Sequence, residues 1–496
     1  MMYTSTRDTS VRVTAAQAIT QGISDEGGLF VPERLPVISR EELAAMVPQT
    51  YIERAVAVLS RFLGDFSEAE VRGCAEAAYG TGRFLAPEVA PVHTLRDGVH
   101  VLELWHGPTC AFKEMALQIL PHLMRVSAEK TSDGKEIVIL VATSGDTGKA
   151  ALEGFRDAPH TRILVFYPEN GVSPMQKLQM TTQQGNNVGV CAIRGNFDDA
   201  QSGVKAIFTD SAMRDKLAQQ GMMFSSANSI NWGRLVPQIV YYFSAYCDLL
   251  ARGAITLGDK VNVAVPTGNF GNILAAYYAR EMGLPIARLI CASNRNNVLT
   301  DFIRTGTYDR KRDFHTTISP SMDILISSNL ERLLYHLSGD DAALTADLMG
   351  KLQKDGCYTV PEALHAKIGE LFSAGWCDDE HTMAAIREIY EQQNYLCDTH
   401  TAVAMAVCET YRRETGDITP LIVASTADPY KFSASVLCAL GAEQAEADEF
   451  DKVDRLNALT GAPIPPSLAM LKGQKPRFNQ VCSRETMEET VCAMLK

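Results

Sequence analysis

The sequence of 496 residues predicts an α/β protein with parallel sheets, preceded by a mostly helical segment. Two observations support this class. Short runs of β-branched and apolar residues, typical of strands buried on both faces, alternate with segments of helical periodicity. Two of these runs end in glycine-rich turns that open helices, as in a parallel sheet with crossover helices.

Residues 1–92 are expected to form the mostly helical unit. A short alternating strand at 11–13 leads into a helix at about 14–21, which ends at Gly22. Three further helical patterns follow at about 39–46, 51–62 and 67–78. Their periodicity, with few strand patterns between them, separates this unit from the rest of the chain.

Residues 93–255 are expected to form a first α/β domain and residues 256–496 a second. The first has strand patterns at 137–141, 162–167 and 188–193, and longer helical patterns at about 198–219 and 231–251. The second has strand patterns at 261–265, 287–292 and 421–424. A helical insertion is expected at about 330–395, and the C-terminal segment is expected to be polar and helical.

Composition narrows the function classes. Apolar and charged residues make up 46% and 21% of the chain, as in ordinary globular proteins, and no apolar run reaches membrane-spanning length. A net charge of −13 argues against nucleic acid as a partner. The twelve cysteines form no CxxC pair and no HExxH occurs, so no metal site is expected. The N-terminus has no signal pattern, and a cytoplasmic protein is expected.

The segment His106–Gln118, HGPTCAFKEMALQ, contains the candidate catalytic residue. Gly107-Pro108 breaks an apolar run, and a helical pattern starts near Thr109 with Lys113 in its first turns. Burial and the positive end of a helix both lower the pKa of a lysine. Only the free amine attacks a carbonyl, so this environment suits a Schiff-base lysine. The alternative is an ordinary lysine at a helix surface.

Glycine-rich turns follow two of the predicted strands. The first is ATSGDTG at 142–148 and the second is PTGNFGN at 266–272. Each brings backbone amides and a helix N-terminus together, which makes an anion site at the carboxyl edge of the sheet. Neither turn fits the nucleotide-binding glycine patterns. A third polar strand end, at Ser425 and Thr426, follows the strand at 421–424.

Together these segments resemble the threonine synthase family of the long type. That family belongs to the fold type II, tryptophan synthase β-like pyridoxal-phosphate enzymes. The resemblance covers nearly the whole chain. It also includes YTSTRD, QGISDEGGLFVP, NSINWGRLVPQ, SPSMDILISSNLERLL and DTHTAVA. It implies two parallel-sheet α/β domains, an N-terminal mainly helical domain and a helical insertion.

The resemblance implies pyridoxal 5'-phosphate as cofactor, with Lys113 as its Schiff-base lysine. The loop Gly268, Asn269, Phe270, Gly271 and Asn272 would bind the cofactor phosphate. Ser425 or Thr426 would contact the pyridine nitrogen. A neutral hydroxyl there leaves this nitrogen less fully protonated, so the ring withdraws electrons less strongly. Ser144, Asp146 and Thr147 would hold the substrate carboxylate. An aspartate is awkward beside a carboxylate, so Asp146 could instead face the cofactor's phenolic oxygen or the substrate amine.

The implied reaction converts O-phospho-L-homoserine and water to L-threonine and phosphate. It makes the protein a carbon–oxygen lyase, with a small-molecule substrate, and a monomer or homodimer is expected. The freed Lys113 amine is the natural proton shuttle. A second anion pocket must hold the substrate phosphate. Its candidates are Asn228, Asn231, Arg234 and Lys149, with Arg7 or Arg332 if the chain folds back.

Several positions depart from the family pattern. Glu114 follows the lysine where aspartate is common, and Cys110 stands where leucine is usual. Asp428 replaces a histidine near the cofactor ring, which affects the expected protonation of the site. His400, in DTHTAVA, is otherwise expected to be structural.

Two other functions use the same residues. One is a lyase or dehydratase that eliminates phosphate or water and releases a keto acid. The other is a binding protein for phosphate or an amino acid that has lost its chemistry. The presence of Lys113 argues against the binding protein. Measuring threonine and 2-oxobutyrate as products distinguishes the lyase or dehydratase from threonine synthesis.

Overall fold

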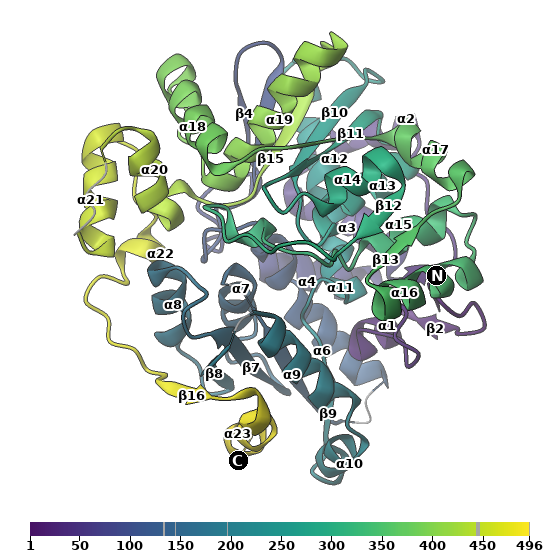
Figure 1. Ribbon diagram of the computed structural model, residues 1–496. Coiled ribbons are helices and arrows are strands. Elements are labelled where there is room, and N and C mark those ends of the chain that lie inside the picture. The colour runs from purple at the N-terminus through teal and green to yellow at the C-terminus, as the bar shows by residue number, and fades with distance from the viewer. Residues whose placement is uncertain (132–133, 144, 196, 443–446, 496) are drawn as a thin grey trace.

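Two mainly parallel sheets form the centres of the two α/β units (Figure 1). The computed structural model describes residues 1–131, 134–143, 145–195, 197–442 and 447–495. The first sheet has the order β16-β8-β7-β6-β9, with every pair parallel. Its strands are β6 (Glu136–Ala142), β7 (Thr161–Pro168), β8 (Val188–Ile193), β9 (Met222–Ser225) and β16 (Gln480–Cys482).

The second sheet has the order β14-β11-β10-β15-β5-β4. Only its edge strand β4 runs antiparallel to its neighbour, β5. Its strands are β4 (Val92–Thr94), β5 (Val99–Glu103), β10 (Val261–Pro266), β11 (Ile286–Ser293), β14 (Phe372–Trp376) and β15 (Leu421–Ser425). A separate antiparallel pair joins β12 (Thr307–Asp309) and β13 (Cys357–Thr359).

The N-terminal unit is mainly helical, as predicted. Its helices are α1 (Ala15–Gln21), α2 (Arg40–Met46), α3 (Tyr51–Phe62) and α4 (Glu68–Tyr79). Each begins at a serine or threonine whose side chain accepts from the third helical amide, with a Glu or Gln side chain bonded back in return. A small antiparallel sheet, β2-β1-β3, accompanies them. Its strands are β1 (Met2–Ser5), β2 (Val13–Thr14) and β3 (Phe30–Pro32).

The remaining helices cover the sheets and their edges. Those within residues 93–255 are α5 (Glu114–Leu117), α6 (Leu120–Thr131), α7 (Asp146–Gly154), α8 (Pro174–Thr181), α9 (Phe197–Thr209), α10 (Ser211–Gln219), α11 (Trp232–Leu235) and α12 (Pro237–Ala251). Those after residue 255 are α13 (Gly271–Glu281), α14 (Val298–Thr305), α15 (Leu330–Leu337), α16 (Ala342–Asp355), α17 (Glu362–Leu371), α18 (Asp379–Gln393), α19 (Thr399–Thr415), α20 (Ser433–Ala439), α21 (Glu449–Thr460), α22 (Pro466–Ala469) and α23 (Met487–Met494). Three short 3-10 helices are η1 (Pro320–Met322), η2 (Pro429–Phe432) and η3 (Arg484–Thr486).

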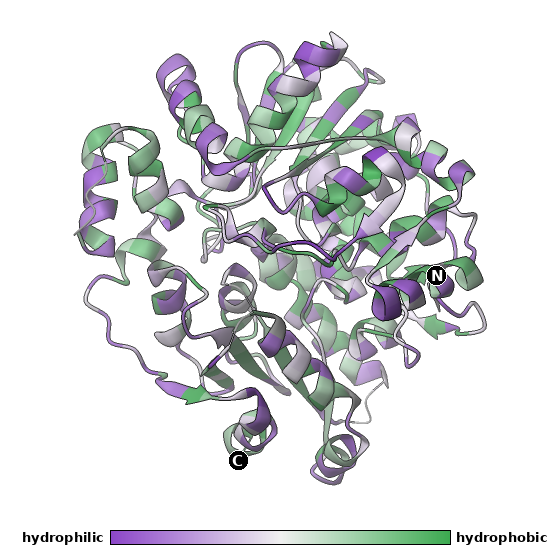
Figure 2. Ribbon diagram, in the orientation of Figure 1, coloured by the Kyte–Doolittle hydropathy of each residue, from purple (hydrophilic) through white to green (hydrophobic). Residues whose placement is uncertain are grey.

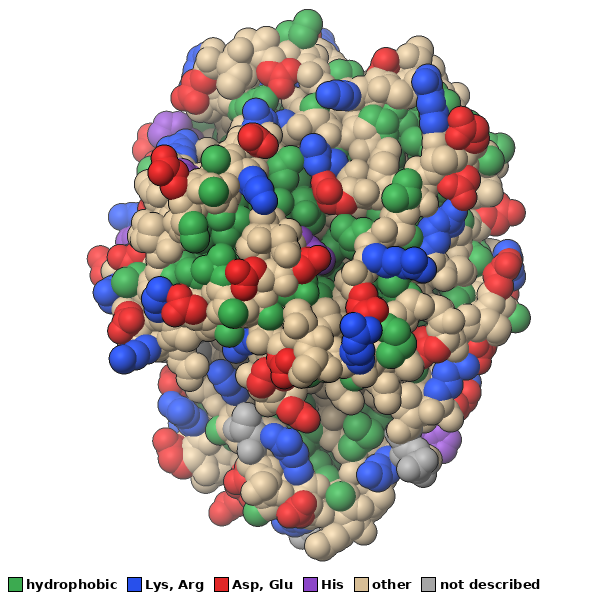
Figure 3. All heavy atoms as spheres, turned by 90° about the vertical axis from the view of Figure 1, so that its right-hand side faces the viewer, with side chains coloured by type: hydrophobic (Ala, Val, Ile, Leu, Met, Phe, Trp, Pro, Cys, Tyr) green, Lys and Arg blue, Asp and Glu red, His purple; other side chains and the backbone are tan. Residues whose placement is uncertain are grey.

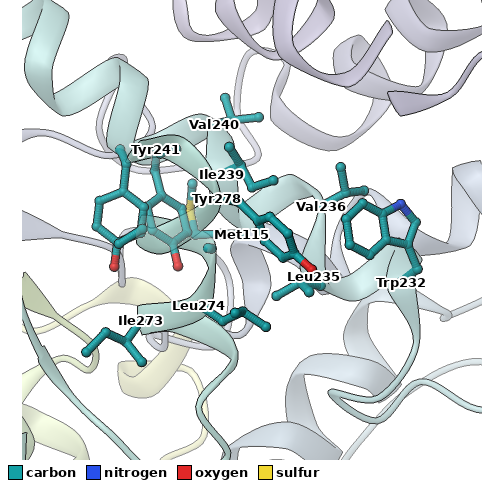
Figure 4. Close-up of a cluster of buried hydrophobic side chains, with 14 of the residues drawn as sticks. Met115, Trp232, Leu235, Val236, Ile239, Val240, Tyr241, Ile273, Leu274 and Tyr278 are labelled. Carbon is teal, nitrogen blue, oxygen red and sulfur yellow. The ribbon is translucent and has the colours of Figure 1, made fainter. Parts of the chain in front are cut away.

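Helix α12 lies at the centre of the largest hydrophobic core, and nearly all its side chains are buried. Figure 4 shows side chains of α11, α12 and α13 meeting Met115 of α5 in this core. Each large apolar side chain buried in this way stabilises the fold by about 1.5–3 kcal/mol. The packing fixes the short helix that follows Lys113. Figure 2 shows apolar strands inside the molecule and polar faces on peripheral helices such as α18 and α21.

Strand membership differs in part from the sequence divisions. The segment 330–395 is mostly helical, as expected, but it also supplies β14 to the second sheet. The C-terminal segment supplies β16 to the first sheet, and β5 pairs with β15 of the second. These pairings depend on distant partners, which local patterns do not specify.

Two long helices expected from the sequence are each broken. The helix expected at 231–251 divides into α11 and α12, because Pro237 has no backbone N–H and cannot donate the hydrogen bond that would continue α11. The helix expected at 198–219 divides at Asp210, whose side chain accepts from Met213 N and caps α10.

Charges of both signs are interspersed over the face shown in Figure 3, so the net negative charge forms no single patch there. Among the described helices, none is both long and apolar enough to cross a membrane. Within the same described residues, no group of three or more His, Cys, Asp or Glu is arranged to hold a metal ion.

Candidate active site

Lys113 immediately precedes α5, in a loop attached to the end of β15. Phe112 N donates to Thr426 O at 2.8 Å, and Ala111 pairs with Ala427 in an isolated bridge. The helix begins at Glu114 and not near Thr109, because Cys110 has a left-handed backbone with φ of 59°. These contacts place the end of β15 beside the loop that carries Lys113.

The Lys113 side chain has the electrostatic environment that its neighbours in sequence predict. Burial of the amine, followed by repulsion from Arg234, lowers the pKa of Lys113 to about 7. Its Nζ lies 4.7 Å from the centre of the Phe112 ring and has no hydrogen bond or ion pair with any residue that the structure describes. A large fraction of this amine is therefore neutral near pH 7 and able to act as a nucleophile or base.

The turn after β6 forms the first glycine cradle. Thr143 Oγ1 accepts from the amides of Gly145 and Gly148, which closes the turn at the start of α7. Gly145 has φ of 136°, and an added Cβ would lie 2.3 Å from the Gln176 side chain. Glycine is required there. Ser144, predicted to contact the substrate carboxylate, lies outside the described residues.

Asp146, at the start of α7, is neutralised by a buried lysine from the other α/β unit. Lys431 Nζ lies 2.5 Å from Asp146 Oδ1, and the two side chains are 0% and 4% exposed. Burial opposes ionisation of Asp146, but Lys431 outweighs it and lowers the pKa of the carboxyl to about 2. Because its charge is paired, Asp146 need not repel an anionic ligand in the same turn.

Lys431 and Ser321 were missed as site residues by the sequence reasoning. Lys431 Nζ also donates to Thr109 O at 3.0 Å, and Ser321 Oγ donates to Asp146 Oδ2 at 3.2 Å. Lysine is rarely fully buried without a partner. The position of Lys431 shortly after the strand end at Ser425 was the one hint in the sequence. Asp146 lies 285 positions earlier, and no local pattern links the two residues.

The turn after β10 forms the second cradle. Phe270 has a left-handed backbone with φ of 62° and precedes α13, whose first amides have no acceptor within the helix. An added Cβ on Gly268 would lie 2.8 Å from Ser321 O. The Asn269 carbonyl is held by Asn329, which donates through its backbone amide at 3.1 Å and its side chain at 3.2 Å.

Asn272, the last residue of this cradle, has one unpaired polar atom. Its Oδ1 accepts from Tyr241 OH at 2.9 Å and also from Tyr242 OH. Its Nδ2 is buried and has no hydrogen-bond partner among the described residues. A buried donor without an acceptor is costly, so an anion at this helix N-terminus would satisfy it.

Ser425 ends β15 in a buried hydroxyl cluster. Its Oγ accepts from Trp105 Nε1 at 2.9 Å and from Thr401 Oγ1 at 3.0 Å. Ser425 O accepts from Leu104 N at 3.0 Å, so β15 is tied to the strand that precedes the lysine loop. Ser425 and Thr426 are both buried. The lysine, the second cradle and this strand end thus belong to one sheet edge or to loops bonded to it.

Arg234 is the predicted phosphate ligand that keeps an unpaired charge. Its guanidinium is buried and donates to Ala227 O at 2.8 Å and Thr147 Oγ1 at 3.3 Å. It has no ion pair with a described carboxylate, and burial alone lowers its pKa to about 10. A buried cation without a counterion favours an anionic ligand. Asn228 lines a cleft of about 1880 Å³ that also reaches Asn269 of the second cradle.

The other predicted phosphate ligands are engaged within the protein. Asn231 caps α11, and its amide donates to Ile19 O and Ser226 O. Lys149 pairs with Glu153, and Arg7 forms two hydrogen bonds with Glu331. Arg332 is fully buried and donates to Phe30 O, Ile230 O and Asn329 Oδ1. These contacts give each of the four a structural role.

Two of the positions that depart from the family pattern carry buried carboxyls. Asp428 Oδ1 accepts from Tyr430 N at 2.8 Å, and burial raises the pKa of Asp428 to about 7. Glu114 accepts from Thr109 N, and burial raises the pKa of Glu114 to about 8. Cys110 is also buried, and its Sγ lies 3.3 Å from Ser467 Oγ.

Three family models match the chain in order. They describe a threonine synthase N terminus over residues 2–79, a pyridoxal-phosphate dependent enzyme over residues 85–350, and a threonine synthase C-terminal region over residues 401–491.

Individual relatives agree with these models. Threonine synthase of Pseudomonas aeruginosa is 40% identical over 467 residues, which cover 92% of this chain and 96% of that protein. Human threonine synthase-like 1 is 41% identical over 96% of this chain, but the match spans only 64% of that longer protein. The crystal structure of pyridoxal-phosphate-bound threonine synthase from Brucella melitensis superposes with a TM-score of 0.87 at 37% identity. That match covers 100% of this chain and 99% of the other.

Proposed function

Because this chain belongs to the threonine synthase family of pyridoxal-phosphate-dependent enzymes, we propose that it makes L-threonine and phosphate from O-phospho-L-homoserine and water. The chain spans about 64% of the length of the human relative, so this proposal concerns the activity of the shared region. The observation that carries it is the position of Lys113 on a loop bonded to the strand end at Thr426, with no hydrogen-bond or ion-pair partner for its amine among the described residues.

The residues present fit pyridoxal phosphate. The cradle at residues 268–272 leaves no room for a Cβ at Gly268, and it offers free helix-start amides and the unpaired Asn272 Nδ2 to a phosphate. Lys113 would hold the aldehyde carbon, and Ser425 or Thr426 would contact the pyridine nitrogen. When bound, the cofactor supplies an electron sink for the negative charge that develops on the substrate carbons.

Side chains and amides of the protein would bind the substrate and transfer its protons. Arg234 is suited to hold an anionic group of the substrate, because its charge is buried and unpaired. The amides and Thr147 at the start of α7 are suited to the carboxylate, with Asp146 neutralised by Lys431. The Lys113 amine takes protons from the α- and β-carbons and returns protons at the α- and γ-carbons.

Product analysis tests the proposal. Purified protein with pyridoxal phosphate and O-phospho-L-homoserine should release threonine and phosphate in equal amounts. Lys113→Ala should lower this rate by about 10²–10⁴-fold or more and abolish the cofactor adduct trapped by borohydride. Lys351→Ala is the matched control, because Lys351 is an exposed lysine whose sole ion pair among the described residues is with Asp347, one helical turn away.

Two results would reject the proposal. Phosphate and 2-oxobutyrate without threonine would identify an enzyme that stops after elimination. No cofactor absorbance and no adduct would identify a binding protein without this chemistry.

We further infer a cytoplasmic enzyme, a monomer or a homodimer, that acts on a small molecule. The cysteines support a reducing compartment, because most of the twelve are buried and none belongs to a CxxC pair. Fractionation and light scattering of the natural protein test these two inferences.

A further inference from the structure

His400 forms a buried pair with Asp398 at the start of α19. The two side chains are 2% and 0% exposed, and His400 Nδ1 lies 2.7 Å from Asp398 Oδ2. The other ring nitrogen, Nε2, accepts from the backbone amide of Ser321 at 3.1 Å. Ser321 is the central residue of η1, which lies 79 positions earlier in the chain. His400 therefore adds a polar contact between α19 and η1, beside the hydrophobic cluster in which Met322 of η1 packs with Val403 and Val407 of α19.

These partners define the protonation of His400. A backbone amide can only donate, so Nε2 must carry a lone pair and the ring hydrogen must lie on Nδ1. Asp398 is suited to accept it, because this carboxylate also accepts from the amides of His400 and Thr401 and from Thr401 Oγ1. The imidazole is thus neutral and oriented from both sides.

Ser321, which His400 holds, contacts both glycine cradles. Its Oγ donates to Asp146 Oδ2 at 3.2 Å, on the turn that follows β6. Its carbonyl oxygen lies so close to Gly268, on the turn that follows β10, that a Cβ added to this glycine would lie 2.8 Å from it. One backbone position therefore touches the predicted carboxylate site and the predicted cofactor-phosphate site. A displacement of Ser321 would alter both.

We propose that His400 is a positioning residue whose neutral imidazole, held by Asp398, fixes Ser321 between the two cradles. This inference rests on the proposed function of those cradles. His400 acts through Ser321 and does not itself contact the cofactor or the substrate. Its loss should weaken the binding of cofactor and substrate more than it slows the chemical step, because Lys113 and Arg234 are not among its contacts.

A pair of variants tests the acceptor role of Nε2. His400→Leu keeps the side-chain volume but removes the acceptor, and His400→Gln restores an oxygen that can accept from Ser321 N. We expect His400→Leu to raise the Kd of pyridoxal phosphate and the KM of O-phospho-L-homoserine about tenfold each, the factor typical of one lost buried hydrogen bond. His400→Gln should return both to within about threefold of wild type.

His336→Leu is the matched control. His336, on α15, is another largely buried histidine. Its Nε2 lies within hydrogen-bond distance of Tyr278 OH, at 3.0 Å, and its hydrogen bonds among the described residues reach neither cradle. It should lose thermal stability without a change in cofactor Kd or substrate KM. If His400→Leu behaves like this control, His400 is only structural and the proposal is wrong. Equal defects in His400→Leu and His400→Gln would also overturn it, because the acceptor would then not matter.

Nitrogen NMR of histidine-labelled wild-type protein provides a test that does not depend on a folded variant. In the His400 ring, Nδ1 should carry the hydrogen and Nε2 none. A hydrogen on Nε2 would contradict the proposal. Failure of the proposed function is distinguishable, since absence of threonine in the wild type leaves the cofactor Kd and the tautomer as independent readouts for His400.

Discussion

Replacement of Lys431 by methionine should strongly destabilise the protein. Methionine is similar in length but removes the charge that faces Asp146 Oδ1 at 2.5 Å. Both side chains are almost fully buried, so the variant would leave an unpaired carboxylate in the interior. Breaking a buried ion pair in this way costs about 3–5 kcal/mol. Thr109 O would also lose the shorter of its two hydrogen bonds and keep the one from Gln179 Nε2 at 3.4 Å, for at most about 1 kcal/mol more.

Urea unfolding of the cofactor-free protein measures this cost. Lys472→Met is the matched control, because Lys472 and Asp454 pair at 2.6 Å with side chains 58% and 55% exposed. A solvent-exposed pair contributes about 0–1 kcal/mol, so the control should unfold close to wild type. The double variant Lys431→Met/Asp146→Asn should recover much of the loss, because a neutral pair leaves no buried charge.

The pH dependence of the Lys431→Met defect has a definite sign. In the wild type, the pKa of Asp146 lies below its unfolded value, so its contribution is present above about pH 4 and lost as pH falls through about 2. Without Lys431, burial is the largest remaining influence and raises the pKa of Asp146, opposed by the hydrogen bond from Gln176. The deficit should then shrink on acidification toward pH 5. A loss below about 1 kcal/mol that does not change with pH would refute the assigned role of this pair.

Three further predictions concern the cofactor and substrate sites. Attachment of pyridoxal phosphate to the cofactor-free protein should speed up as pH rises through about 7, the pKa of Lys113, and then level off; an increase that continues to pH 10 would indicate an ordinary lysine. Arg234→Met should lower kcat/KM for O-phospho-L-homoserine by about 10–100-fold and raise the pKa of Lys113, and a spectral pH titration checks the second effect. Gly268→Ala should weaken cofactor binding at least about tenfold, because its Cβ meets Ser321 O, whereas Gly350→Ala, with open space around it, should bind cofactor normally.

Short stretches of sequence were enough to indicate the candidate residues that lie within one turn or one helix. The local patterns raised Lys113 and the glycines at 268–272 as candidates, and the family resemblance then assigned their roles toward the cofactor. The N-terminal helices were predicted from their helical periodicity, and in the structure each begins at a serine or threonine with Glu or Gln three residues later.

The relations between distant segments were not predictable from local pattern. Lys431 pairs with Asp146, and His400 bonds to Ser321, only after the two α/β units have formed. Asn231 resembled a ligand in sequence, but it caps α11, because an asparagine serves equally well for either purpose. The end of the chain reads as polar and helical, yet β16 joins the first sheet through pairing with β8.

The fate of oxygen from labelled water tests the central claim most directly. With O-phospho-L-homoserine in ¹⁸O-water, the account predicts threonine with one ¹⁸O in its hydroxyl group and unlabelled phosphate, because water adds at the β-carbon and the γ-carbon–oxygen bond breaks. Labelled phosphate together with homoserine would show simple phosphate hydrolysis. That product pair, or 2-oxobutyrate in place of threonine, would contradict the account.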